Sequence, residues 1–346
     1  MISRAPLHIP YLDGWRGLAI VFVLIGHFSR TPVFGWLGWF GVALFFALSG
    51  RLMGELLFVK RVRLGEFFVR RATRVLPTFW LFIATMALAT LALPDWHASG
   101  EQVLTTLAFL STYFPPEAST QHHAWPVGHI WSLNVEEHTY VWLAGCAVLA
   151  RVLRIPAQWL LLATFALGLA CMLHYMGLAD APAHWQWRTE VASMAIVASA
   201  AVRCLPLLRS RALAPLPLLA CALAAVCYAS YLHKGVHLWL ASLCLAFAVN
   251  YLHVTPARLL QLLASPWLRW FGRCSFSLYL WQQPFFAAVN AGALHPVLGL
   301  LGGVSVGALS FYLFEDPARR YLNGKWAQRA ARPLPAEVNE EEKAAG

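Results

Sequence analysis

Arg16 and His27 are the first residues in the chain that could do chemistry, because both stand in the apolar stretch WRGLAIVFVLIGHF, residues 15–28. On an α-helix, their spacing of eleven residues gives a rise of about 16 Å and a rotation of only about 20° between the side chains. Ionisable side chains inside a membrane helix usually face the protein interior or a wet cavity. A snorkelling arginine and a hydrogen-bonded core histidine are the alternatives, but for an aligned pair we favour a site that faces the bundle interior.

Glu136, in the stretch HIWSLNVEEHTY (129–140), is the second candidate. It should lie about 7 Å below the outer edge of its span, and His27 about 18 Å above the inner edge of a core about 30 Å thick. These depths agree within one helical turn, so the carboxylate could orient the imidazole and raise its basicity. The neighbouring Glu137 is expected to be an interfacial charge.

Arg71 and Arg74 belong to a basic cluster, VRRATR, that precedes the third apolar run. Anchoring by the positive-inside rule would explain such a cluster without any site. The two arginines are also three residues apart, so they share a helix face and could grip a phosphate together. With Arg16 they would form an anion site at the inner surface.

The elements that position these residues are membrane helices, since 59% of the residues are hydrophobic and only 12% are charged. A soluble domain would hold about 25% charged residues. The sequence therefore predicts an all-α, polytopic transmembrane bundle. We expect ten spans, at roughly 15–34, 36–57, 76–94, 131–150, 157–177, 189–208, 213–232, 235–254, 269–291 and 294–314.

The basic residues orient these spans. With the N-terminus in the cytoplasm, all of the 26 Lys and Arg residues except Arg30, Arg188 and Lys234 fall on the cytoplasmic side, which is 23 of 26. Both termini are then cytoplasmic. This asymmetry also accounts for the net charge of +10 without a nucleic-acid partner.

One membrane domain is expected over 1–322, followed by a charged, disordered cytoplasmic tail over 323–346. No metal site is predicted, because the external histidines His122, His123 and His129 lack a carboxylate and a firm ligand spacing.

Six stretches of the chain, in order from about residue 10 to 322, resemble the acyltransferase 3 family. They are YLDGWRGLAIVFVLIGHF, FFALSG, RATR, WSLNVEEHTY, FGRCSFSLYLWQQP and FEDPARR. The family's Arg-x10-His pattern matches Arg16 and His27, and its Arg-x-x-Arg pattern matches Arg71 and Arg74. Its WSLxxE pattern matches residues 131–136. The family consists of membrane acyltransferases that modify O-antigen, exopolysaccharides, antibiotics and similar acceptors.

Two positions depart from the family pattern. Arg51 stands where phenylalanine is common, and Gln282 stands where histidine is common. Glutamine can keep a hydrogen bond but cannot take a proton, which leaves His27 as the membrane-embedded histidine with the right setting. The polar and aromatic side chains expected to contact substrate are Trp131, Ser132, Tyr279, Trp281 and Gln282.

The resemblance implies an O-acyltransferase of the bacterial cytoplasmic (inner) membrane. Acyl-CoA, expected to be acetyl-CoA, would dock its phosphates on the arginines from the cytoplasm, with no tightly bound cofactor. His27 would act as general base on a hydroxyl of a cell-surface or exported carbohydrate or lipid-linked glycan, with Glu136 as its orienter.

A transporter or flippase that uses the same residues as a pathway is the main alternative. It is disfavoured because no inverted repeat is evident. A membrane acyltransferase of an unrelated type is a third reading.

Overall fold

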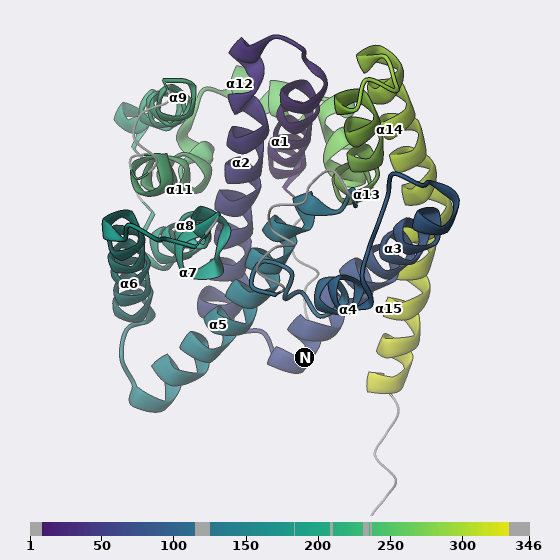
Figure 1. Cartoon of the computed structure of the whole chain (residues 1–346). Helices are drawn as coiled ribbons and strands as arrows, with labels where there is room; N and C mark the ends of the chain where they lie inside the picture. Colours follow the sequence, from purple (N-terminus) through teal and green to yellow (C-terminus); the bar gives the residue numbers. More distant parts are fainter. Residues whose placement is uncertain are drawn as a thin grey trace, which may run out of the picture.

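The computed structural model describes residues 9–114, 125–182, 184–207, 210–230, 235 and 237–331 (Figure 1). Within these ranges the secondary structure is entirely helical, as predicted. The principal helices are α1 (Pro10–Phe28), α2 (Trp36–Met53), α3 (Leu64–Ala92), α4 (Gly100–Leu107), α5 (Trp131–Leu153), α6 (Ala157–Gly177), α7 (Thr189–Ala192), α8 (Met194–Cys204), α9 (Leu216–Ala229), α11 (Ser242–Asn250), α12 (Ala257–Leu263), α13 (Pro266–Asn290), α14 (Pro296–Ser310) and α15 (Asp316–Ala331).

Short π- and 3₁₀-helical turns join or extend these helices. The π turns are η2 (Gly54–Val59), η6 (His237–Ala241) and η8 (Phe311–Glu315). The 3₁₀ turns are η1 (Pro32–Phe34), η3 (Gly128–Ile130), η4 (Trp185–Trp187), η5 (Arg211–Leu213) and η7 (Leu252–Val254). Because η2 follows α2 directly and η8 joins α14 to α15, two of the longest helical segments contain a π turn, a feature often found near functional sites.

Five helical segments of the described chain are long and apolar enough to cross a membrane. They are Pro10–Phe28, Pro32–Val59, Leu64–Ala92, Ala157–Gly177 and Pro296–Gln328. The helices α5 and α13 have 23 and 25 residues but are not among them. These two helices carry most of the polar candidate site residues, which lower their hydropathy. The count of ten spans and the cytoplasmic placement of both termini stay predictions.

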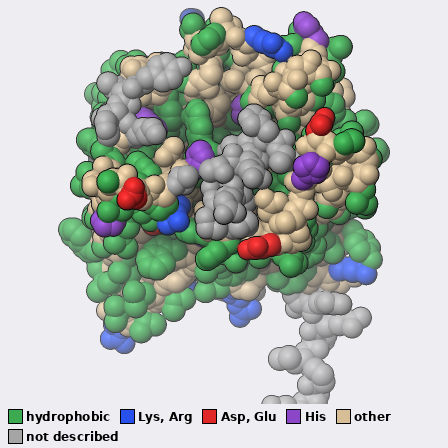
Figure 2. Space-filling model, viewed as in Figure 1, with side chains coloured by type: hydrophobic (Ala, Val, Ile, Leu, Met, Phe, Trp, Pro, Cys, Tyr) green, Lys and Arg blue, Asp and Glu red, His purple; other side chains and the backbone are tan. Residues whose placement is uncertain are grey.

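The outer surface of the bundle is rich in apolar side chains. Leu91 on α3 is 83% exposed and Leu313 in η8 is 74% exposed. Figure 2 shows hydrophobic side chains spread over the visible face, with few charged ones among them. Water would hydrate such a surface at a large free-energy cost, whereas lipid would cover it without that cost.

α1 lies between α2 and α13 at the centre of the fold (Figure 1). Glycines allow this close approach. A Cβ atom on Gly17 would lie 1.9 Å from the carbonyl oxygen of Leu268, and one on Gly272 would lie 1.9 Å from that of Asp13. Small residues at such crossings are typical of membrane helix packing. The close contact fixes which face of α1 is turned toward α13.

Two boundaries differ from the prediction. α3 begins at Leu64 and not near 76, so the basic cluster lies within the helix and not before it. At the other end, α15 continues to Ala331, so the predicted disorder does not hold for 323–331. Ion pairs from Asp316 to Arg319 and Arg320, at helical spacings, stabilise the start of α15. Residues 332–346 lie outside the described ranges.

Candidate active site

Two cavities inside the bundle bring the predicted site residues together. The larger, of about 410 Å³, is lined by His27, and we call it the histidine cavity. The smaller, of about 80 Å³, is lined by Arg16, Arg71 and Arg74, and we call it the arginine cavity. Arg16 and His27 project from one side of α1, as their spacing predicts, but each lines a different cavity.

The two cavities share two lining residues, Val42 of α2 and Tyr279 of α13. The Tyr279 hydroxyl donates a hydrogen bond of 2.9 Å to the carbonyl oxygen of His129 and lies 2.7 Å from the Ser132 hydroxyl. Tyr279 is therefore held in place from η3 and α5. Its ring and the Val42 side chain form the partition between the arginine cavity and the histidine cavity.

The His27 imidazole is fixed on two sides. Its Nδ1 lies 2.8 Å from Oε1 of Gln282, and its ring stacks on Phe286 with centroids 4.2 Å apart. An amide oxygen can only accept, so this contact assigns the proton to Nδ1 and leaves a lone pair on Nε2. On the Nε2 side stands Gly38, and a Cβ there would lie 3.6 Å from this nitrogen, in van der Waals contact with the ring. Because Gly38 has no side chain and His27 lines the histidine cavity, Nε2 is the ring nitrogen left to accept a proton there.

Arg71 is bound by two carboxylates of α5. Its Nε donates to Oε1 of Glu137 and its Nη2 donates to Oε2 of Glu136, both at 2.8 Å. Its guanidinium also lies over the Tyr140 ring, 4.4 Å from the centroid. Arg71 does line the arginine cavity, but two N–H groups of its fork already have carboxylate partners. It therefore ties α3 to α5 and is less available to a ligand than predicted.

The expected contact between Glu136 and His27 is not formed, which corrects the prediction. Glu136 accepts hydrogen bonds from Arg71 and, at 2.5 Å, from the Ser49 hydroxyl, so it belongs to the arginine cavity. Glu137, expected to be an interfacial charge, is paired with Arg71. The depth argument assumed upright helices, whereas α5 runs obliquely across the bundle (Figure 1).

Arg16 and Arg74 differ from Arg71. Neither makes a hydrogen bond or ion pair to any part of the chain that the structure describes. Three arginines and one carboxylate, that of Glu136, line the cavity. Like charges in a site of low dielectric repel one another strongly, so an anion between Arg16 and Arg74 would be stabilising.

Aromatic rings form one wall of the histidine cavity. Trp131 is stacked on Trp187, with centroids 5.8 Å apart, and Trp39 lies 5.8 Å from Trp131. All three line the cavity. Trp131 thus stands where the prediction placed it, while Ser132, one residue on, lines the arginine cavity.

The remaining two predicted contacts have different outcomes. Trp281 does not line either cavity; it packs edge-to-face on Phe82 of α3, with centroids 5.3 Å apart. Two residues along a helix turn a side chain by about 200°, so Trp281 cannot share the direction of Tyr279. Gln282 is fully buried and lies behind His27, where it contacts the imidazole and not the cavity.

Arg51, the other departure from the family pattern, caps a helix. Its Nη1 donates to the carbonyl oxygens of Val249 and Asn250, at 2.8 and 2.9 Å, at the end of α11. A cation at that position satisfies orphan carbonyls and complements the helix macrodipole. Of the three external histidines, His122 and His123 lie outside the described residues.

Several residues of the site were not predicted, notably Ser49, Gly38, Trp187 and Phe286. Ser49 belongs to the stretch FFALSG, so a motif marked its position without giving a role. Trp187 and Phe286 carry no such signal, because apolar aromatic residues are common throughout this chain.

A family comparison agrees with this arrangement. The family model described as an acyltransferase domain, acyltransferase 3, matches residues 9–314. The match and the apolar helices define an integral membrane protein with an acyltransferase domain. The chain belongs to the acyltransferase 3 family.

Curated relatives share this domain. The chain is 24% identical to the peptidoglycan O-acetyltransferase OatA of Listeria monocytogenes over 356 residues, 90% of this chain and 56% of OatA. It is 25% identical to YrhL of Bacillus subtilis over 359 residues, 90% of this chain and 55% of YrhL. The chain thus spans about half the length of these relatives. No solved structure matches it.

Proposed function

We propose that the chain is an O-acyltransferase that moves an acyl group, an acetyl group in the simplest case, from acyl-CoA to a hydroxyl of a glycan. One observation carries the proposal: a cavity with two unpartnered arginines and a cavity with a free imidazole nitrogen meet at Tyr279 and Val42. A donor rich in phosphate and an acceptor hydroxyl could thus approach one reaction centre from opposite sides.

The donor phosphates would bind Arg16 and Arg74, with Arg71 held beside them by Glu136 and Glu137. The arginine cavity, about 80 Å³, is small beside a whole coenzyme. Only one end of the donor is therefore placed in it. For the thioester to reach His27, the ring of Tyr279 would have to move aside.

The acceptor would occupy the histidine cavity, where the aromatic side chains of Trp39 and Trp131 suit the apolar face of a sugar ring. Nε2 of His27 would take the hydroxyl proton as the oxygen attacks the thioester carbonyl. The carbon–sulfur bond then breaks, and the CoA thiolate leaves and recovers the proton from the imidazolium. Tight walls around the thioester would limit hydrolysis.

Glycan acceptors are proposed because OatA is named for peptidoglycan O-acetylation. The cytoplasmic membrane of a bacterium is the corresponding location, since donor and acceptor would meet across it.

The test uses the purified chain reconstituted in sealed proteoliposomes with acetyl-CoA and a panel of glycan acceptors. Free CoA thiol is measured together with acetylated glycan. Acceptor-dependent CoA release, with one acetyl ester formed per thiol, is the expected result. Glycan movement across the membrane with no CoA release would favour the transporter alternative and contradict the proposal.

A further inference from the structure

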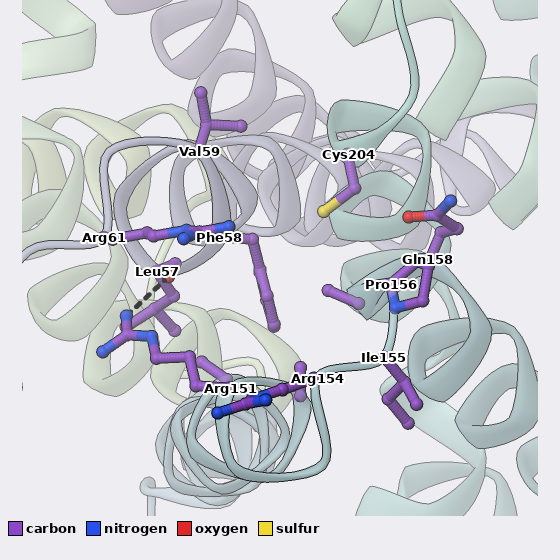
Figure 3. Close-up of a pocket in the computed structure, with 13 residues that line it drawn as sticks. Leu57, Phe58, Val59, Arg61, Arg151, Arg154, Ile155, Pro156, Gln158 and Cys204 are labelled. Atoms are coloured by element: carbon purple, nitrogen blue, oxygen red, sulfur yellow. Dashed lines mark hydrogen bonds between the residues drawn. The ribbon is translucent and has the colours of Figure 1, made fainter.

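A third cavity, of about 500 Å³, lies beyond the end of α2 that is remote from His27 (Figure 3). It is bounded by η2, the end of α5 and the start of α6, and it shares no lining residue with the arginine cavity. Among the described residues, its lining includes three arginines, Arg61, Arg151 and Arg154, and no Asp or Glu.

Two of these arginines have an unusual backbone conformation. Arg61 follows η2 with φ of +52°, and Arg154 ends α5 with φ of +56°, in the left-handed region that non-glycine residues seldom adopt. Within the described ranges, neither side chain has a hydrogen bond or ion pair. Arg151 donates to the carbonyl oxygen of Leu57 at 3.2 Å, which ties α5 to η2. The cavity therefore has an excess of positive charge without a counter-ion.

The N-terminus of α6 adds to this positive potential. Pro156 precedes this helix of 21 residues and provides no side-chain cap, and both Ala157 and Gln158 line the cavity. The first N–H groups of a helix and its macrodipole attract anions. Figure 3 shows Pro156 and Gln158 across the cavity from Arg61 and Arg151.

The surroundings of the cavity are apolar. Phe58 and Ile155 belong to its wall, and Val152 and Trp159 nearby are 70% and 62% exposed. Trp159 belongs to α6, a candidate membrane span, and tryptophan is enriched at membrane–water interfaces. A soluble phosphate compound would gain nothing from these apolar side chains, whereas a phospholipid would bury its acyl chains against them.

We propose that this cavity binds the phosphate group of an anionic phospholipid through Arg61, Arg151 and Arg154, with the acyl chains lying along α6. Basic clusters at the membrane surface attract anionic lipids, at about 1 kcal/mol for each Lys or Arg. The site is separate from the proposed donor site and does not depend on acyl transfer.

Native mass spectrometry of the full-length protein, given equal amounts of phosphatidylglycerol and phosphatidylcholine, tests this proposal. The unaltered chain should retain phosphatidylglycerol preferentially. In the double variant Arg151→Gln/Arg154→Gln, the amount of retained phosphatidylglycerol should fall at least about tenfold. The matched control, Arg258→Gln, removes an exposed arginine from α12 and should retain as much as the unaltered chain.

Equal retention of the two lipids, or unchanged phosphatidylglycerol in the double variant, would overturn the proposal. So would displacement of phosphatidylglycerol by CoA that depends on the same arginines.

A second measurement uses the unaltered chain, so it remains valid if the double variant does not fold. Cys204 lines the cavity, so its alkylation by a maleimide should be slowed by phosphatidylglycerol and not by phosphatidylcholine. Equal alkylation rates in both lipids would again contradict the site.

Discussion

At the scale of single residues, the contact between His27 and Gln282 decides which nitrogen of His27 can act in the histidine cavity. Gln282 stands where a second histidine is common in the family, and it accepts from Nδ1 of His27. The contact fixes both the tautomer and the direction of Nε2. In this chain, Gln282 therefore positions the proposed base, His27, and cannot itself act as a base.

Replacing Gln282 by Ala should lower kcat about ten- to hundredfold and leave the KM for the donor nearly unchanged, because the His27 ring loses its hydrogen-bond partner and its orientation. Steady-state kinetics of both substrates checks this. Trp281→Phe is the matched control, since that side chain packs toward α3 and should keep near-normal kinetics. Normal kcat in Gln282→Ala would mean that His27 is oriented by other contacts.

Arg71 and Arg74 belong to one sequence motif but have different surroundings, so replacing them should affect different properties, donor binding for Arg74 and stability for Arg71. Arg74→Ala should weaken acetyl-CoA binding about ten- to hundredfold with little change in Tm, because it removes a charge-assisted phosphate contact. Arg71→Ala should mainly lower Tm, because Glu136 and Glu137 lose their shared cation. Calorimetry and a thermal melt distinguish the two. Identical effects of both variants would contradict this division.

At the scale of helices, the contact between α1 and α13 sets the geometry of the site. Gly17 and Gly272 bring the two backbones close enough for His27 of α1 to reach Gln282 of α13. Larger residues at these positions would force the helices apart, because the nearest atoms belong to backbone and cannot turn away.

Gly272→Ala should destabilise the protein by about 1–3 kcal/mol, the usual range for overpacking, and should lower activity with it. Gly145→Ala is the control, because a Cβ on Gly145 meets nothing within 4 Å. It should be neutral or stabilising by up to about 1 kcal/mol, since alanine favours the helix. Equal melting temperatures for the two variants would rule out a tight α1–α13 contact.

Local sequence patterns predict much of the site, but they do not predict which side chains on different helices contact each other. Helical periodicity is enough to place Arg16 and His27 on one face of α1. It cannot identify Gln282 as the partner of His27, since that contact spans 255 positions in sequence. Depth arguments fail for Glu136 because the tilt of α5 comes from packing and not from its own residues.

At the scale of the whole molecule, the apolar outer surface and the asymmetry of basic residues imply a fixed orientation in the membrane. The arginine cavity and the histidine cavity lie toward opposite ends of α1, so orientation decides which compartment supplies the donor. If the positive-inside rule holds for this chain, the donor comes from the cytoplasm.

Cysteine labelling in intact cells tests this orientation. In a variant without the seven native cysteines, Asp95→Cys should react with a membrane-impermeant maleimide. Arg63→Cys should react only after the cells are opened. Both positions are exposed, so access to the reagent and not burial decides the result. The reverse pattern would place the arginine cavity outside the cell and contradict a cytoplasmic donor.

The central claim is that His27 is the base that activates the acceptor, and His27→Gln tests it most directly. Glutamine keeps a hydrogen bond but cannot take the proton. In one assay of acetyl-CoA binding and acceptor acetylation, this variant should bind the donor normally. Its kcat should fall by about 10²–10⁴, the usual range for a lost general base. Full acyl transfer by a well-folded His27→Gln protein would contradict the account.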